Sequence, residues 1–91
     1  MFYHYATLKN NNTVICHSEN RGTDNQPRVL VHVETPAEEG GFKECELFIP
    51  DMTLKYNKGY STFELTDIIT FVKGSIELMI EFSKCGGASN A

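Results

Sequence analysis

Gly59-Tyr60-Ser61-Thr62-Phe63-Glu64-Leu65 is the stretch of sequence that decides the fold. It has the pattern of a capping box, in which Ser61 accepts a hydrogen bond from the amide of Glu64 and the Glu64 carboxylate accepts one from the amide of Ser61. Tyr60 and Leu65 flank this pair as a hydrophobic staple would. The stretch therefore predicts a helix start, and the residues before it must form the sheet that this helix covers.

From residue 62 onward, apolar residues recur at the three-and-four spacing of one helical face. The members of this stripe are Leu65, Ile68, Ile69, Val72, Ile76 and Met79. Gly74-Ser75 interrupts the pattern. An interior glycine costs about 1 kcal/mol against alanine, so we expect either a kink there or two helices end to end. Gly86-Gly87 predicts the C-terminal stop, and residues 88–91 are expected to be a flexible tail.

The first half of the chain is patterned as strands. The expected strands cover residues 2–8, 13–17, 28–35, 42–49 and, as a short fifth strand, 53–56. The asparagine triplet at 10–12 tolerates left-handed backbone conformations and favours a turn, so the first two strands are expected to form a hairpin. The break at residues 36–41, with its two glycines, predicts a second hairpin.

Period-2 alternation assigns the faces of the two longest strands. One face is expected to be apolar and to comprise Val29, Val31, Val33, Cys45, Leu47 and Ile49. The other face is expected to be mixed and partly exposed, with Leu30, His32, Glu34, Phe42, Glu44, Glu46 and Phe48. These patterns together predict a single α+β domain over residues 1–87. In it, an antiparallel sheet of four to five strands is covered on one face by a kinked C-terminal helix.

The size and charge of the chain limit its possible functions. Ninety-one residues are enough for one domain. The net charge is −4, with twelve acidic against eight basic side chains. Nucleic-acid binding depends on Lys and Arg neutralising phosphates, so the composition argues against a nucleic-acid partner. An acidic surface suits solubility or a basic protein partner.

The sequence predicts a cytoplasmic protein with no membrane partner and no cofactor. No apolar run approaches the roughly 18–20 residues of a membrane span. The first residues also lack the basic-then-apolar layout of a signal peptide. Cys16, Cys45 and Cys85 are odd in number and widely spaced. That spacing indicates neither a disulfide framework nor a zinc knuckle, so we expect reduced thiols.

The three histidines are His4, His17 and His32. None has a second ligand at a helical or short-loop spacing, so no metal site is predicted. The plainest interpretation places all three on the solvated face of the sheet. His32 and Glu34 lie two apart on one strand and share a face, where the carboxylate could raise the pKa of the imidazole. The candidates for catalysis are therefore His32, Glu34 and His17.

The remaining acidic and thiol side chains favour structural roles. Glu44 and Glu46 repeat on one strand face, and nothing in the sequence indicates a pocket that would desolvate one of them for acid–base work. Cys45 is expected to be buried, where a thiol behaves as a small hydrophobe. Cys85, a candidate for exposure, follows a helix C-terminus, which disfavours a thiolate. No catalytic nucleophile is predicted.

Residues 27–82 carry a series of short motifs. They are Pro27, His32-Val33, Phe48-Ile49-Pro50, Gly59-Tyr60-Ser61 with Glu64-Leu65, and Leu78 with Phe82 near the helix end. In this series the chain resembles a family of small bacterial proteins known as domain of unknown function 4160. The resemblance implies a small bacterial protein that is often encoded beside another small protein, in arrangements like toxin–antitoxin pairs.

The chain departs from that family pattern around its strand over 28–35. The family usually shows two histidines there, and this chain has Leu30 where the earlier one should fall. Arg28-Val29 also stands in place of a Pro-Pro pair. A role that depends on both histidines would therefore be lost in this protein.

Two functions from different classes remain open. The first is a non-enzymatic protein–protein interaction module, which would bind a partner or a second copy through an exposed sheet edge or through a mixed face. The residues of that face are Phe42, Glu44, Glu46 and Phe48. The alternative is a small hydrolase or ribonuclease that uses His32 and Glu34, with His17 across the sheet. An acidic mimic of nucleic acid ranks last, because the acidic residues are spread over loops and helix.

Overall fold

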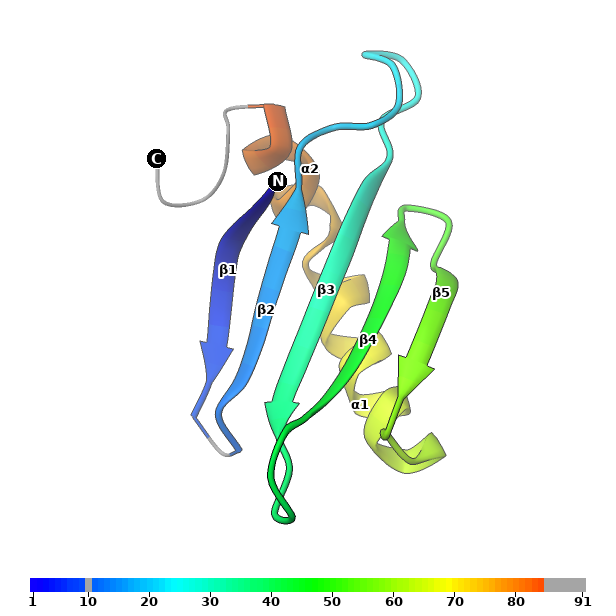
Figure 1. Cartoon of the computed structure of the whole chain (residues 1–91). Coiled ribbons are helices and arrows are strands. Elements are labelled where there is room, and N and C mark those ends of the chain that lie inside the picture. Colours follow the sequence, from blue (N-terminus) through cyan, green and yellow to red (C-terminus); the bar gives the residue numbers. More distant parts are fainter. Residues whose placement is uncertain (10, 85–91) are drawn as a thin grey trace.

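The computed structural model describes residues 1–9 and 11–84 as an α+β fold (Figure 1). The strands are β1 (Phe2–Leu8), β2 (Thr13–Ser18), β3 (Val29–Pro36), β4 (Phe42–Ile49) and β5 (Thr53–Lys58). The helices are α1 (Thr62–Gly74) and α2 (Ile76–Lys84). The expected strands are confirmed, and β5 continues past its expected end to Lys58. The predictions made for Cys85, Gly86-Gly87 and the tail fall outside the described residues.

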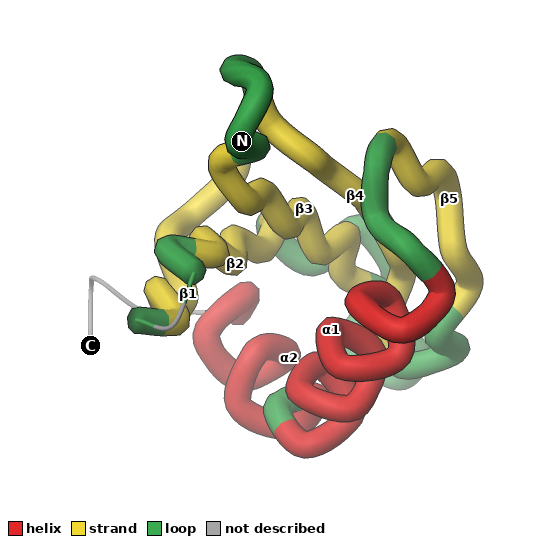
Figure 2. The backbone as a smooth tube through the Cα atoms, turned by 90° about the horizontal axis from the view of Figure 1, so that it is seen from below, coloured by secondary structure: helices red, strands yellow, loops and turns green. Residues whose placement is uncertain are grey.

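The sheet is a meander in which each strand pairs with its neighbour in the sequence. The strand order is β1-β2-β3-β4-β5, and every pairing is antiparallel. Both helices lie behind the sheet in the view of Figure 1, and Figure 2 shows them gathered on one side of it. One face of the sheet is therefore covered by helices. The opposite face is called the open face below.

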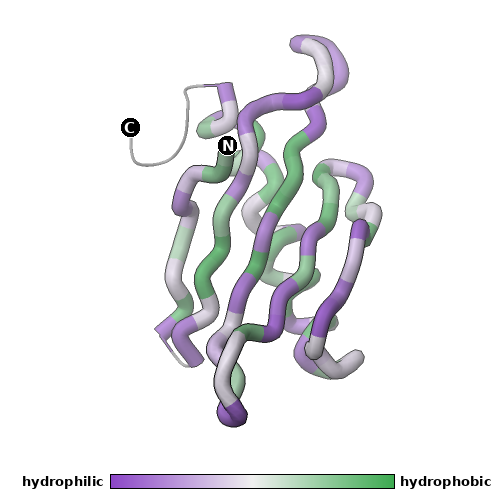
Figure 3. Tube along the Cα trace, in the orientation of Figure 1, coloured by the Kyte–Doolittle hydropathy of each residue, from purple (hydrophilic) through white to green (hydrophobic). Residues whose placement is uncertain are grey.

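Alternation along the strands decides which side chains point toward the helices. All the residues predicted to point inward are at most 1% exposed: Val29, Val31, Val33, Cys45, Leu47 and Ile49. They form one core cluster with Ile68, Val72 and Met79 of the helices. Figure 3 shows hydrophobic and hydrophilic residues alternating along the central strands. Each buried aliphatic side chain contributes about 1.5–3 kcal/mol, so this layer is the main contact that stabilises sheet against helix.

The capping box at the start of α1 is present as predicted. Ser61 Oγ accepts a hydrogen bond from the Glu64 amide at 3.1 Å, and Glu64 Oε1 accepts one from the Ser61 amide at 3.0 Å. The interruption predicted at Gly74-Ser75 separates two helices, so a single kinked helix is not what covers the sheet. The Ser75 amide donates to the Val72 carbonyl, which closes α1 with a tighter turn.

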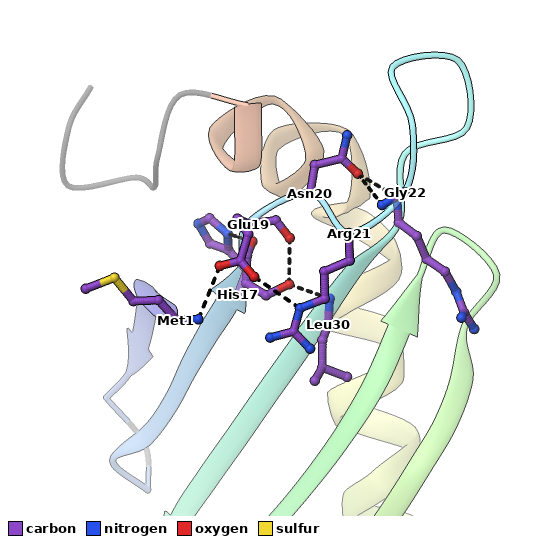
Figure 4. A network of polar contacts seen from close by, with 9 residues as sticks. Met1, His17, Glu19, Asn20, Arg21, Gly22 and Leu30 are labelled. Carbon is purple, nitrogen blue, oxygen red and sulfur yellow. Dashed lines mark hydrogen bonds and ion pairs between the residues drawn. The ribbon is translucent and has the colours of Figure 1, made fainter.

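In the loop between β2 and β3, backbone amides donate hydrogen bonds to a side-chain oxygen (Figure 4). Asn20 Oδ1 accepts from the amide of Gly22 at 2.9 Å and from the amide of Arg28 at 3.0 Å. Residue 22 has to be glycine, because a Cβ there would overlap the Gln26 carbonyl oxygen. Glu19, at the start of this loop, binds the N-terminal amine at 3.2 Å. The loop is therefore joined to the beginning of β1 by an exposed ion pair.

Candidate functional site

His32 occupies the centre of the open face. It lies on the middle strand between Val31 and Val33, which are buried against the helices, so alternation directs its ring to the opposite side. Its cross-strand neighbours are Cys16 on β2 and Glu46 on β4. The side chain is 17% exposed. The ring is thus accessible from solvent and largely surrounded by its neighbours.

Two carboxylates hold the His32 ring, one at each nitrogen. Nδ1 donates to Glu46 Oε2 and Nε2 donates to Glu34 Oε1, both at 2.8 Å. When both carboxylates are ionised they can only accept, so both nitrogens then carry protons and the ring is a cation. Partial burial opposes that charge, but the hydrogen bonds and charges of the two glutamates outweigh it and raise the pKa of His32. The predicted proximity of His32 and Glu34 is confirmed.

Glu46 is a nearly buried carboxylate, at 8% exposure. Besides His32, it has Lys55 of β5, whose Nζ lies 3.4 Å from Glu46 Oε1. A buried carboxylate is costly unless it is paired, and here two cationic groups from the neighbouring strands pair with it. The expectation that this face of the strand is partly exposed is therefore wrong for Glu46, because the strands on both sides bring side chains over it.

Glu44 is the next carboxylate along β4 and the direct cross-strand partner of Glu34. It accepts a hydrogen bond from the Tyr56 hydroxyl at 3.1 Å. Desolvation and this bond raise the pKa of Tyr56 to about 12, so the phenol stays a neutral donor. One donor atom each from His32, Glu34 and Glu44 lies within 4.8 Å of the others. Among the described residues, this group has the composition and spacing to hold a metal ion.

His17 lies on the opposite side of the sheet from His32. It is 0% exposed, so the prediction of a solvated His17 is wrong. The reason is that it follows the buried Ile15 by two positions on β2 and points with it toward the helices. Its Nδ1 donates to the Ser18 carbonyl at 2.9 Å, and its Nε2 has no hydrogen-bond partner within the part of the chain that is described. The fold does not bring His17 and His32 together.

Neither the half-buried thiol of Cys16 nor the buried thiol of Cys45 is suited to nucleophilic attack. Cys16 pairs with His32 across β2 and β3, but burial and the charge of Glu34 raise its pKa. Cys45 is buried, as predicted, and desolvation raises its pKa to about 11. The thiolate is the reactive form of cysteine, so these two side chains remain inert thiols at neutral pH.

The residues predicted to form an interaction face do lie on the open face of β4. They are Phe42, Glu44, Glu46 and Phe48. The two glutamates are bound within the chain, and the Arg28 guanidinium lies 3.9 Å from the centre of the Phe48 ring. Arg28 is itself paired with Asp51 at 2.9 Å. Phe42, at the end of the strand and 56% exposed, is the member of the set that is most clearly presented to solvent.

Two pockets among the described residues lie at the end of the sheet where α1 begins. One, of about 100 Å³, is lined by Leu8, Asn11, Thr13, Thr35, Tyr60, Glu64, Asp67 and Ile68. In its wall the hydroxyls of Thr13, Thr35 and Tyr60 form a chain with oxygen–oxygen distances of 2.6 and 2.8 Å. Neither this pocket nor the wider depression beside it is lined by His32. The His32 cluster is therefore part of a sheet surface and lies in neither pocket.

One signal in the sequence could have located the partners of His32. A hairpin that turns over residues 37–41 pairs residues equidistant from its centre, which places Glu46 opposite His32 and Glu44 opposite Glu34. The position of Lys55 beside Glu46 could not be predicted in the same way, because the register of β4 with β5 shifts at an irregularity next to Glu46. The carboxylates of the cluster were thus predictable in principle, whereas the lysine was not.

Comparisons with protein-family models, with curated proteins and with solved structures find no significant match for this chain. The resemblance to the domain of unknown function 4160 family stays an expectation from the sequence. Within the described residues, neither helix is long and apolar enough to cross a membrane.

Proposed function

We propose that this chain is a non-enzymatic interaction module that pairs with a second copy of itself along β1. β1 is an outer strand of the sheet and is bonded to β2 on one side. Its residues, Phe-Tyr-His-Tyr-Ala-Thr-Leu, include no lysine, arginine, aspartate or glutamate. The outward N–H and C=O groups of an edge strand are a template for another strand. This uncharged, aromatic edge is the observation that carries the proposal.

The other outer strand, β5, differs in the feature that matters for pairing. It contains Lys55 and Lys58 within its six residues. Lysines on an edge strand oppose the approach of another strand, because pairing would desolvate them or bring them against their counterparts. The two edges of the sheet are therefore unequal, and β1 is the one open to association.

β1 is also held firmly in place by its own side chains. The Tyr5 ring packs 6.3 Å from Phe71 and 6.1 Å from Phe82, measured between ring centres, on the helix side of the sheet. The Phe2 ring lies 5.5 Å from that of His32 on the open face. A strand that is ordered before it binds loses less conformational entropy on association. The edge is thus prepared to accept a partner strand.

A second copy of the chain fits this edge by charge and by size. A charged partner strand would place unpaired charges against the uncharged aromatic residues of β1. The β1 strand of a second copy carries no Lys, Arg, Asp or Glu and avoids this cost. Two chains joined antiparallel through β1 would be related by a two-fold axis, the commonest symmetry of homo-oligomers. The shared interface would also add to the limited surface that 91 residues can bury.

Two other functions have less support. The resemblance noted in the sequence implies a small protein encoded nearby, as in toxin–antitoxin pairs, and the same edge could accept a strand from such a partner. A hydrolase or ribonuclease would use His32 and Glu34. Both nitrogens of the His32 ring are hydrogen-bonded to carboxylates, and His32 lines neither of the two pockets described above that could hold a substrate.

Gel filtration with light scattering tests the self-association. We expect the wild-type chain to be a dimer, and Thr7→Lys to be a folded monomer, because Thr7 is an exposed residue of β1 and lysine blocks edge pairing. Leu54→Lys is the matched control, since it places the same charge on an exposed position of β5. Circular dichroism verifies that each variant is folded.

Two results would contradict the proposal. A wild-type chain that is monomeric at all measured concentrations would remove its basis. A Thr7→Lys variant that stays dimeric, or a Leu54→Lys variant that becomes monomeric, would place the interface away from β1.

A further inference from the structure

We propose that His32, Glu34 and Glu44 bind one divalent transition-metal ion on the open face of the sheet, with Zn²⁺ as the ion that fits the donors best. The site draws on β3 and β4, in the middle of the most extensively paired part of the fold. It is independent of pairing through β1, so either proposal can fail while the other stands.

The donor atoms already lie close to a binding geometry. One nitrogen of His32 and one oxygen from each of the two glutamates are all within 4.8 Å of one another. Zinc binds nitrogen and oxygen at about 2.0–2.2 Å, which separates neighbouring donors of a tetrahedral site by about 3.3 Å. Both glutamate side chains are partly exposed and can rotate. Such rotation can shorten the donor–donor distances from at most 4.8 Å to about 3.3 Å without moving the strands.

His32 is oriented as metal-binding histidines are. Such a histidine usually donates its second ring N–H to a carboxylate, which fixes the tautomer and the direction of the ring. Here Nδ1 donates to the nearly buried Glu46 at 2.8 Å, and Lys55 holds the other oxygen of that carboxylate. Nε2 is left on the side of Glu34 and Glu44. The outer partner of the proposed ligand is thus already in place.

The negative charges of Glu34 and Glu44 also favour the binding of a further cation. Glu34 and Glu44 are direct cross-strand partners, an arrangement of like charges that destabilises a sheet. Among the described residues, Glu34 has an ion pair with His32, whereas Glu44 has only the neutral Tyr56 hydroxyl as a donor. A metal ion would take the position of the Nε2 proton, which is released to solvent, and would neutralise both carboxylates.

The mixture of donors selects the class of metal. Mg²⁺ and Ca²⁺ prefer sites made wholly of oxygen. An imidazole combined with carboxylates suits zinc and other divalent ions of the first transition row. The proposed site therefore takes a transition metal in preference to the more abundant alkaline-earth ions.

Isothermal titration calorimetry of the full, tag-free chain with ZnCl₂ at neutral pH tests the proposed zinc site. We expect saturable one-to-one binding that is lost in His32→Gln and in Glu44→Gln. Glu46→Gln should keep the ligands and weaken binding about 10–100-fold, as loss of the outer carboxylate does. His4→Gln and Cys16→Ser are the matched controls, because they remove another exposed histidine and the thiol opposite His32, and both should bind as the wild type does.

Three outcomes of the zinc titration would contradict the proposed site. The wild type could show no saturable binding, or Glu44→Gln could bind with unchanged affinity. Loss of binding in Cys16→Ser would indicate that a thiol is a ligand instead. Because His32→Gln also removes two hydrogen bonds, Glu44→Gln is the decisive variant: it leaves the contacts of His32 intact. A magnesium titration that matches the zinc affinity would equally refute the choice of metal.

Discussion

Replacing Ser61 with alanine removes the side chain that begins α1. In the folded chain Ser61 Oγ accepts a hydrogen bond from the Glu64 amide at 3.1 Å, and the Ser61 amide donates to Glu64 Oε1 at 3.0 Å. Alanine keeps the second bond, because the backbone amide remains, but it leaves the Glu64 amide without its protein acceptor. Lys43 of β4 binds the same carboxylate at 2.7 Å, so the cap also anchors the helix start to the sheet.

The expected cost follows from this geometry. Loss of a serine N-cap destabilises a protein by about 1 kcal/mol, within a range of about 0.5–2. A domain of this size has a free energy of unfolding of roughly 5–14 kcal/mol, so the variant still folds. For a domain of 60–100 residues, about 1 kcal/mol corresponds to a fall in Tm of about 4–8 °C. We therefore expect Ser61→Ala to melt about 4–8 °C below the wild type.

Urea unfolding and thermal melts followed by circular dichroism measure this effect. Thr66→Ala is the matched control, because it deletes a hydroxyl from the exposed side of the same helix, where Thr66 bonds only to the Thr62 carbonyl at 2.9 Å. That control should change the free energy of unfolding by less than about 0.5 kcal/mol. If the two variants are equally stable, the capping argument is refuted.

The remaining predictions concern Gly74 and Glu64. Gly74→Ala should raise the free energy of unfolding by about 0.5–1 kcal/mol, because alanine loses less conformational entropy in a helix than glycine does. A Cβ at this position meets no atom within 4 Å. A lower urea midpoint for the variant would show that the helix break requires glycine. Hydrogen bonds from Lys43 and from the Ser61 amide lower the pKa of Glu64 from 4.5 to about 2, so the stability that its carboxylate provides is complete above about pH 4.5 and is lost as the pH falls to about 2. Urea titrations at a series of pH values should show the difference between wild type and Glu64→Gln narrowing across that window, and a constant difference would contradict the assignment.

Local signals in the sequence were enough to predict most of the fold. The pair Ser61 and Glu64 marks the helix start because both partners of a cap lie within one turn. The alternation of Val29, Val31 and Val33 assigns the buried face because strand geometry has a period of two. The interruption at Gly74-Ser75 was visible too, but whether it bends one helix or separates two depends on the hydrogen bond from Ser75 to Val72.

The candidate site was harder to predict, because it depends on which residues are brought together from separate strands. The spacing of His17 two residues after Ile15 indicated that both side chains point toward the helices. A histidine is polar, however, and polarity alone favours an exposed position, so the sequence carried two conflicting signals. The burial of Glu46 depends on His32 from β3 and Lys55 from β5. The irregular register of β5 with β4 is not encoded in any short motif, so the place of Lys55 beside Glu46 could not be predicted, whereas the hairpin register of β3 with β4 was enough to place the glutamates.

The order of elements along the chain has a consequence for biosynthesis. Among the residues that the structure describes, all five strands precede both helices, and every strand pairs with its immediate predecessor or successor. Such local hairpins can form as soon as their residues leave the ribosome, because the loops that they close are short. The apolar side of the nascent sheet then has no cover until α1 and α2 have left the ribosome as well. At about 5–20 residues per second, that interval lasts a few seconds, and it is the period in which the chain is most exposed to aggregation or to capture by a chaperone.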